Sequence, residues 1–151
     1  KFQQSPEMKD AFDSVVGENV ALIKSIPSTQ FNAIEGAVMR SVQSGRDLKG
    51  LQDELIALGA KSKERAALIA RDQNNKATAV MSKARRLTLG LTQAKWVHSG
   101  AGHKPRQSHV DASGTIYDVE KGCLIDGEYI MPGEKINCRC QARAVIPGFE
   151  D

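Results

Sequence analysis

The sequence predicts an α+β fold, with about four helices in an N-terminal region and a small antiparallel β-rich unit after them. Apolar residues recur at steps of three and four up to about residue 90, and short β-prone segments separated by turn-forming residues follow. Aromatic residues make up only 5% of the 151 residues, so Ala, Leu, Ile and Val must build most of the core, which favours helices. There is no run of about 18 apolar residues, so no membrane partner is expected.

The first two predicted helices are separated by Pro27. Pro6 suits the first position of a helix, and Ser5 before it suits a cap. Ser28 is expected to cap the second helix, which Gly45 ends. The apolar face of the first helix is Met8, Phe12, Val15, Val16, Val20 and Ile23, and that of the second is Phe31, Ile34, Val38 and Val42.

The third and fourth predicted helices begin at Asp47 and near Ser62, both of which are capping residues. Gly59 ends the third helix, whose apolar face is Leu48, Leu51, Leu55 and Leu58. The fourth is expected to run to about Leu89, because its many alanines give it a high helix propensity. A polar run over residues 72–76 marks a place where this helix could kink.

Beyond Gly90 the pattern becomes one of strands and turns. Alternation over residues 92–98 predicts a strand in which Trp96 is a core anchor. Residues 99–107 contain two glycines and a proline, so they are expected to form a loop. The dipeptide Asp126-Gly127 predicts a hairpin turn. The other predicted strands cover residues 115–118, 123–125, 129–131 and 141–146.

Cys138 and Cys140 are the most distinctive candidates for chemistry. Residues two positions apart point to the same side of an extended segment, so both thiolates could bind one zinc ion. They could instead be small buried residues of a tight turn, or one could be a nucleophile with His109 as its base. The odd count of three cysteines favours a reducing compartment over a disulfide scaffold. Further zinc ligands would come from His109, His103, His98 and Cys123.

One segment collects further polar candidates: His98, His103, Arg106 and His109. These residue types suit an acid–base site or a phosphate-binding loop, and they equally suit a solvated loop. The sequence contains neither a Gly-rich phosphate loop nor a Gly-x-Ser-x-Gly elbow. No complete catalytic constellation is therefore evident, and an enzyme is not expected.

The fourth predicted helix and its start carry a cluster of basic residues, in a chain with a formal net charge of +3. A solvated helix surface explains such a cluster, and so does contact with a nucleic-acid backbone or an acidic protein. No base-reading motif accompanies it, so sequence-specific DNA binding is not expected. The basic residues are Lys61, Lys63, Arg65, Arg71, Lys76, Lys83, Arg85 and Arg86.

Several short motifs occur in a characteristic order over roughly residues 47–146. They are Ala70-Arg71-Asp72-Gln73, Leu89-Gly90, Lys95-Trp96-Val97-His98-Ser99, Lys104-Pro105-Arg106-Gln107-Ser108-His109, Pro132-Gly133 and Asn137-Cys138-Arg139-Cys140. In this order the chain resembles the phage Mu F-like head morphogenesis family of minor capsid proteins. The final motif, which runs into the last strand, is the most specific part of the resemblance.

The resemblance implies a structural function in the head of a tailed phage or prophage, in assembly near the portal. It implies portal, capsid or scaffolding proteins as partners, with DNA backbone as a further candidate. The protein would be located in the virion head, and in the host cytoplasm during assembly. It also implies a domain organisation: residues 1–46 as the end of a longer helical region, residues 47–146 as the head morphogenesis domain and residues 147–151 as a tail.

The resemblance also bears on the cysteines. Many members of the family have a Cys-Pro-x-Cys pair before the final motif, which implies a metal site with four ligands. Here Arg106 and His109 stand in the corresponding places, so only His109 would join Cys138 and Cys140 as a ligand. A polar clasp could replace the metal, with Arg106 and His109 hydrogen-bonded to the backbone near Cys138 and Cys140, which would hold the loop onto the final strand. The expected organising cluster is Arg106, His109, Asn137, Cys138, Arg139 and Cys140.

Two alternative functions follow from the same residues. The family domain is also found joined to toxin domains, which allows a nuclease or transferase that uses His98, Arg106 and His109. The basic helix allows a DNA-packaging module that contacts phosphates without reading sequence.

Overall fold

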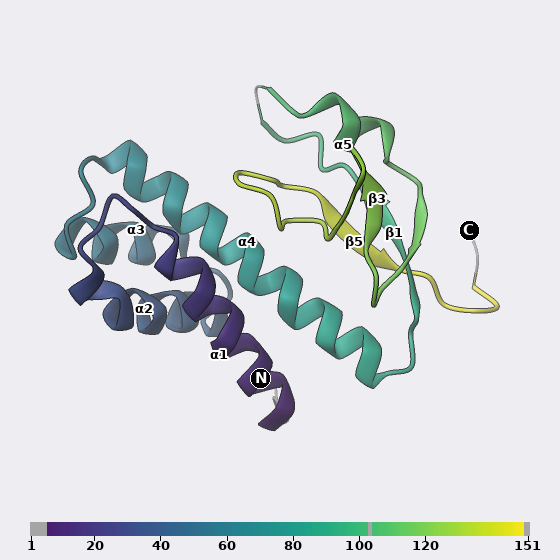
Figure 1. Cartoon of the computed structure of the whole chain (residues 1–151), viewed down its shortest axis with the longest axis horizontal. Coiled ribbons are helices and arrows are strands. Elements are labelled where there is room, and N and C mark those ends of the chain that lie inside the picture. The colour runs from purple at the N-terminus through teal and green to yellow at the C-terminus, as the bar shows by residue number, and fades with distance from the viewer. Residues whose placement is uncertain (1–5, 103, 150–151) are drawn as a thin grey trace. The chain divides into compact units, whose positions relative to one another are not determined.

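The computed structural model describes residues 6–102 and 104–149, except for some side chains of the first helix: Glu7, Met8, Ala11, Phe12 and Val15. It confirms the predicted α+β fold, with helices first and small antiparallel sheets after them (Figure 1). The chain forms two compact units, one up to Val80 and the other from Met81 onward. The predicted cap Ser5 and the apolar positions Met8, Phe12 and Val15 lie outside what is described.

The first unit is built from helices, and the long helix that ends it continues into the second unit. The bounds are α1 Pro6–Ala21, the 3-10 turn η1 Ser28–Gln30, α2 Phe31–Gln43, α3 Leu48–Ala57 and α4 Lys63–Thr88. The helix α4 is continuous through residues 72–76, where the polar sequence allowed a kink. No helix among the described residues has the length and apolar character needed to cross a bilayer.

Two predicted helix caps are confirmed and one is wrong. The Asp47 carboxylate accepts a hydrogen bond from the Gly50 backbone N–H, at 2.9 Å, and the Ser62 hydroxyl accepts one from the Arg65 N–H, at 3.1 Å. Ser28 does not cap α2. It opens η1, because the Gln30 N–H bonds to the Pro27 carbonyl at 3.0 Å, and α2 begins only afterwards.

The core of the first unit combines the predicted apolar faces with a buried polar chain. The side chains of Ile34, Val38, Leu51 and Leu55 are buried, as the periodicity predicts. A fully buried polar residue, Asn74 of α4, donates to the Ser41 hydroxyl at 3.2 Å and to the Ala70 carbonyl at 3.1 Å. Ser41 donates in turn to the Asp47 carbonyl at 2.8 Å, which links α4 to the connection between α2 and α3.

The second unit holds two antiparallel sheets. The strands are β1 Gln93–Val97, β2 Ile116–Asp118, β3 Cys123–Ile125, β4 Glu128–Ile130 and β5 Gln141–Ala144. The first sheet has the order β2-β1-β5, and β3 pairs with β4 in the second. The hairpin predicted at Asp126-Gly127 is confirmed, and both residues have positive φ, 53° and 78°, as a tight hairpin turn requires.

Trp96, in the central strand β1, lies in the apolar core of the second unit. Its side chain is fully buried, which confirms its predicted role as a core anchor. No element was predicted between the loop over residues 99–107 and the strand from residue 115, but a short helix, α5 Gln107–Asp111, lies there. The remaining buried members of this core are Ala94, Tyr117, Val119, Cys123, Ile125, Ile130, Cys138 and Cys140.

Candidate functional site: a buried histidine and cysteine cluster

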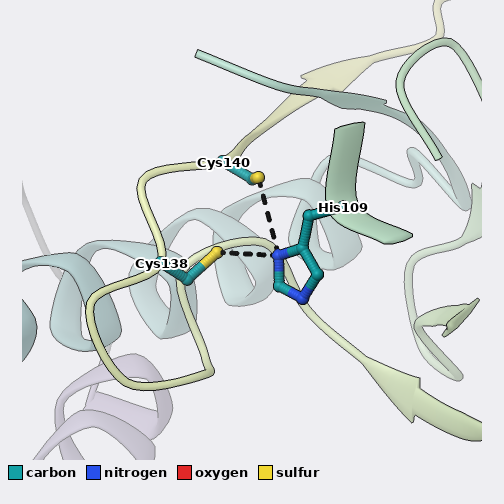
Figure 2. A group of neighbouring side chains, drawn as sticks. All are labelled: His109, Cys138 and Cys140. Atoms are coloured by element: carbon teal, nitrogen blue, oxygen red, sulfur yellow. Dashed lines mark hydrogen bonds between the residues drawn. The ribbon is translucent and has the colours of Figure 1, made fainter. Parts of the chain in front are cut away.

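Two separate segments of the second unit bring one histidine and two cysteines together. His109 comes from α5, and Cys138 and Cys140 come from the segment that leads into β5. The His109 Nδ1 atom lies 3.4 Å from the Cys138 sulfur and 3.8 Å from the Cys140 sulfur (Figure 2). All three side chains are buried, and their candidate ligand atoms lie within 4.8 Å of one another. The cluster is therefore a compact set of nitrogen and sulfur donors inside the core.

A tight turn presents the two cysteines. Asn137 has a φ of 55°, in the left-handed region that Asn adopts more readily than most residues. The Cys138 N–H then closes the turn by donating to the Lys135 carbonyl at 3.0 Å. Asn137 is exposed, and its positive φ is one reason for an Asn at this place in the motif. Arg139, between the cysteines, is half-buried, and its guanidinium carbon lies near Gly102.

Trp96 packs against His109 and holds it in place. The two rings meet edge to face, with centroids 5.2 Å apart and planes at 90°. The Trp96 indole Nε1–H also donates to the His109 backbone carbonyl, at 3.1 Å. His109 is only 4% exposed, so its ring is held by packing as well as by the contacts of Nδ1. The single tryptophan of the chain thus connects strand β1 to the site.

The two thiols differ in acidity. The pKa of Cys138 is lowered to about 5, because its sulfur accepts hydrogen bonds from the Cys140 thiol, from the backbone N–H groups of Cys140 and Gly133, and from His109. The pKa of Cys140 is raised, because its proton is held in the bond to Cys138 and because it is buried. Cys138 is therefore the first of the pair to become a thiolate.

Two of the other predicted site residues also contact the cluster or its turn. Arg106 donates from Nη2 to the Ile136 carbonyl at 3.1 Å, which is the type of contact that the predicted clasp requires. His98, just after β1, places Nδ1 at 3.7 Å from the Cys140 sulfur. Cys123 is separate from the cluster, because it lies in β3 opposite Ile130. The remaining candidate ligand, His103, lies outside the described residues.

Replacing Arg106 by alanine should weaken the second unit modestly. The variant loses one charge-assisted hydrogen bond at an exposed position, which is worth about 0.5–1 kcal/mol. We expect the thermal midpoint of the second unit, followed by Trp96 fluorescence, to fall by about 2–6 °C. Lys104→Ala, another exposed cation on the same segment, is the control and should leave the midpoint unchanged. An Arg106→Ala protein that melts like the control would refute the clasp.

The predicted basic residues differ in the contacts that they make in the structure. Arg65 donates to the Ser25 hydroxyl at 3.2 Å, and Lys76 pairs with Asp72 at 3.0 Å. In the second unit, Lys83 donates to the Glu120 carbonyl at 2.9 Å and Arg86 to the Ala142 carbonyl at 2.6 Å. These four residues therefore have structural contacts within the chain. Lys61, Lys63 and Arg85 are exposed, and Arg71 is half-buried.

Sequence reasoning missed the element that positions His109. The helix α5 has only five residues, too few for a helical period, and the Ser108 hydroxyl anchors it by donating to the Asp126 carboxylate at 2.7 Å. Ser113, shortly after α5, accepts a hydrogen bond from the His98 N–H at 3.2 Å. Pro105 before a run of polar residues was the one local signal that a helix could begin here.

The donor set of the cluster fits a borderline-soft metal ion. Two cysteine sulfurs and one imidazole nitrogen are ligands that zinc prefers, whereas calcium and magnesium need oxygen. The three side chains are buried, and they come from the turn before β5 and from the helix α5, so the fold positions them. His109 Nδ1, Cys138 and Cys140 are therefore the residues that would hold such an ion.

The fold and this cluster define a small α+β domain in which the Asn-Cys-Arg-Cys motif contributes both cysteines to a buried core. Comparison with family models identifies it: residues 32–143 match the model described as Phage Mu protein F like protein, and the chain belongs to that family. The matched region contains every residue of the cluster. No solved structure matches the chain.

One relative is similar along nearly the whole chain. It is an uncharacterized protein of Haemophilus influenzae, which is 30% identical over 148 residues. The match covers 98% of this chain but only 32% of the relative, so the chain spans about a third of that protein's length. Because the relative is uncharacterized, the match assigns no activity, substrate or partner to this chain.

Proposed function

We propose that this chain is part of a minor capsid protein that acts in head assembly, near the portal of a tailed phage or prophage. The observation that carries the proposal is membership of the Phage Mu protein F like family over residues 32–143. Its partners are then portal, capsid or scaffolding proteins. It acts in the host cytoplasm during assembly and remains in the virion head.

The way the site residues are used supports a structural role for them. His109 is buried against Trp96, Arg106 bonds to a backbone carbonyl, and His98 lies against the Cys140 sulfur. These are the three residues that an enzymatic alternative would need, and each contacts the protein core or backbone. We infer that they organise the fold that presents the assembly surface, and that catalysis is not their task.

The proposal is tested in the phage or prophage whose genome encodes the chain. An epitope tag is placed on the protein that contains it, and heads are purified on a density gradient after induction. The tagged protein should band with the heads in a few copies per head, and a short cross-linker should join it to the portal protein. The matched control carries the same tag on a host cytoplasmic protein of similar abundance.

Two results would contradict the proposal. Absence of the tagged protein from purified heads would refute incorporation. If the tagged protein is present but is cross-linked only to major capsid subunits away from the portal vertex, its proposed location near the portal would be refuted.

To test the alternative of a DNA contact, the purified protein is titrated with duplex DNA over a range of salt concentrations. Binding that weakens steeply with salt would instead favour the basic residues of α4 as a phosphate-contacting surface.

A further inference from the structure

The distances within the cluster match those of a four-coordinate metal site. Ligands that lie 2.0–2.3 Å from one zinc ion in a tetrahedron are about 3.3–3.8 Å from each other. The distances from His109 Nδ1 to the two sulfurs are 3.4 and 3.8 Å, and the distance from His98 Nδ1 to the Cys140 sulfur is 3.7 Å. Three contacts between donor atoms thus have the length of a tetrahedral edge.

His98 is placed to supply the remaining ligand. It follows directly on β1, which pairs with β5, the strand that Cys140 precedes. Pairing of Val97 with Gln141 brings the neighbouring residues His98 and Cys140 together at the end of the ladder. His98 is half-buried and lies outside the compact group of the other three donors, so binding one ion requires its ring to turn toward them. A fourth ligand at His98 would therefore draw the site from three separate segments: the end of β1, helix α5 and the turn before β5.

We propose that His98, His109, Cys138 and Cys140 bind one zinc ion as a structural site. Two cysteines and two histidines form a closed four-ligand set, which suits a metal that stabilises a fold. The site connects the end of β1, helix α5 and the turn before β5. These segments are also joined by the β1–β5 pairing and by hydrogen bonds of Trp96 and Arg106. The proposal concerns the second unit alone and does not depend on a role in the phage head.

The first experiment measures metal binding by the whole chain. The protein is purified under reducing conditions, stripped with a chelator, and titrated with zinc in competition with a chromophoric chelator. We expect about one zinc per chain. Cobalt, used as a spectroscopic probe, should give the intense visible bands of a tetrahedral ion and a thiolate-to-cobalt charge-transfer band. Zinc should also raise the thermal midpoint followed by Trp96 fluorescence.

A set of variants assigns the ligands. His98→Gln should weaken zinc binding by about tenfold or more and alter the cobalt spectrum, and because His98 is half-buried the variant should fold. Cys138→Ser should abolish the charge-transfer band or reduce it by about half. The matched control is Cys123→Ala, a buried cysteine of the same unit outside the cluster, which should keep both the affinity and the spectrum.

Each outcome decides the proposal. One zinc with a tetrahedral cobalt spectrum, both altered by His98→Gln, would establish the four-ligand site. Unchanged binding in His98→Gln would overturn His98 as a ligand. Failure of the wild-type chain to bind zinc or cobalt, or equal losses in Cys123→Ala and Cys138→Ser, would overturn the site itself. Far-UV circular dichroism of each stripped variant separates loss of a ligand from loss of the fold.

Discussion

Trp96→Ala should destabilise the second unit by about 3–5 kcal/mol, the usual cost of removing a large aromatic side chain from a core. The side chain is fully buried, packs against both His109 and Tyr117, and donates a hydrogen bond to the His109 carbonyl. A domain of this size has a stability of roughly 5–15 kcal/mol, so the loss is a large part of the total. Urea unfolding followed by hydrogen exchange of amides in β1 and β5 would measure it.

Two further variants serve as comparisons for Trp96→Ala. Trp96→Phe keeps most of the ring but removes the indole donor, so it should cost less, about 1–3 kcal/mol, mainly from the unpaired His109 carbonyl. Leu124→Ala removes an exposed apolar side chain of the same unit and should change stability by less than about 0.5 kcal/mol. A Trp96→Ala protein as stable as Trp96→Phe would show that the ring does not support the core.

Gly122→Ala should have the second large effect, about 2–5 kcal/mol, because two separate costs add. Gly122 has a φ of 100°, which L side chains rarely adopt, and this backbone strain costs about 1–2 kcal/mol. A Cβ atom there would also lie 2.9 Å from the Ile130 carbonyl oxygen and 3.2 Å from its carbonyl carbon and nitrogen. These are backbone atoms of β4, so relief requires the strand itself to move.

Gly114→Ala provides a matched control for the clash. Gly114 also has a positive φ, 92°, but a Cβ atom there would meet nothing within 4 Å. It should therefore show the strain alone, about 1–2 kcal/mol. Trp96 fluorescence during urea unfolding reports on the second unit for both variants, since Trp96 is the only tryptophan. Equal shifts of the two midpoints would contradict the predicted clash with β4.

Features that depend on neighbouring residues were predictable from the sequence. Asp47 and Ser62 cap helices through bonds to residues three positions away, and the Asp126-Gly127 turn follows from the φ values that a tight hairpin needs. The predicted cap at Ser28 was wrong because a serine after a proline suits the start of a 3-10 turn as well as a helix cap. The helix α5 was missed because its stability comes from a bond to Asp126, eighteen residues from Ser108.

The residue types of the site were predictable, but their proximity was not. Twenty-nine residues separate His109 from Cys138, and no spacing rule relates them. Only the order of motifs in the family suggested that they belong together. Strand pairing distinguishes His98 from Cys123 as a candidate for a further ligand. The β1–β5 pairing brings His98 close to Cys140, whereas the β3–β4 pairing keeps Cys123 opposite Ile130.

The left-handed conformation of Asn137 has a consequence for how this family is recognised. The first position of the Asn-Cys-Arg-Cys motif is constrained by its positive φ, whereas the two cysteine positions are constrained by their sulfur atoms. Different substitutions are then permitted at each position. Glycine, which adopts positive φ without steric cost, could replace Asn137, while serine could not replace the sulfurs of a metal site. A family member with Gly at this place should therefore be able to build the same backbone turn.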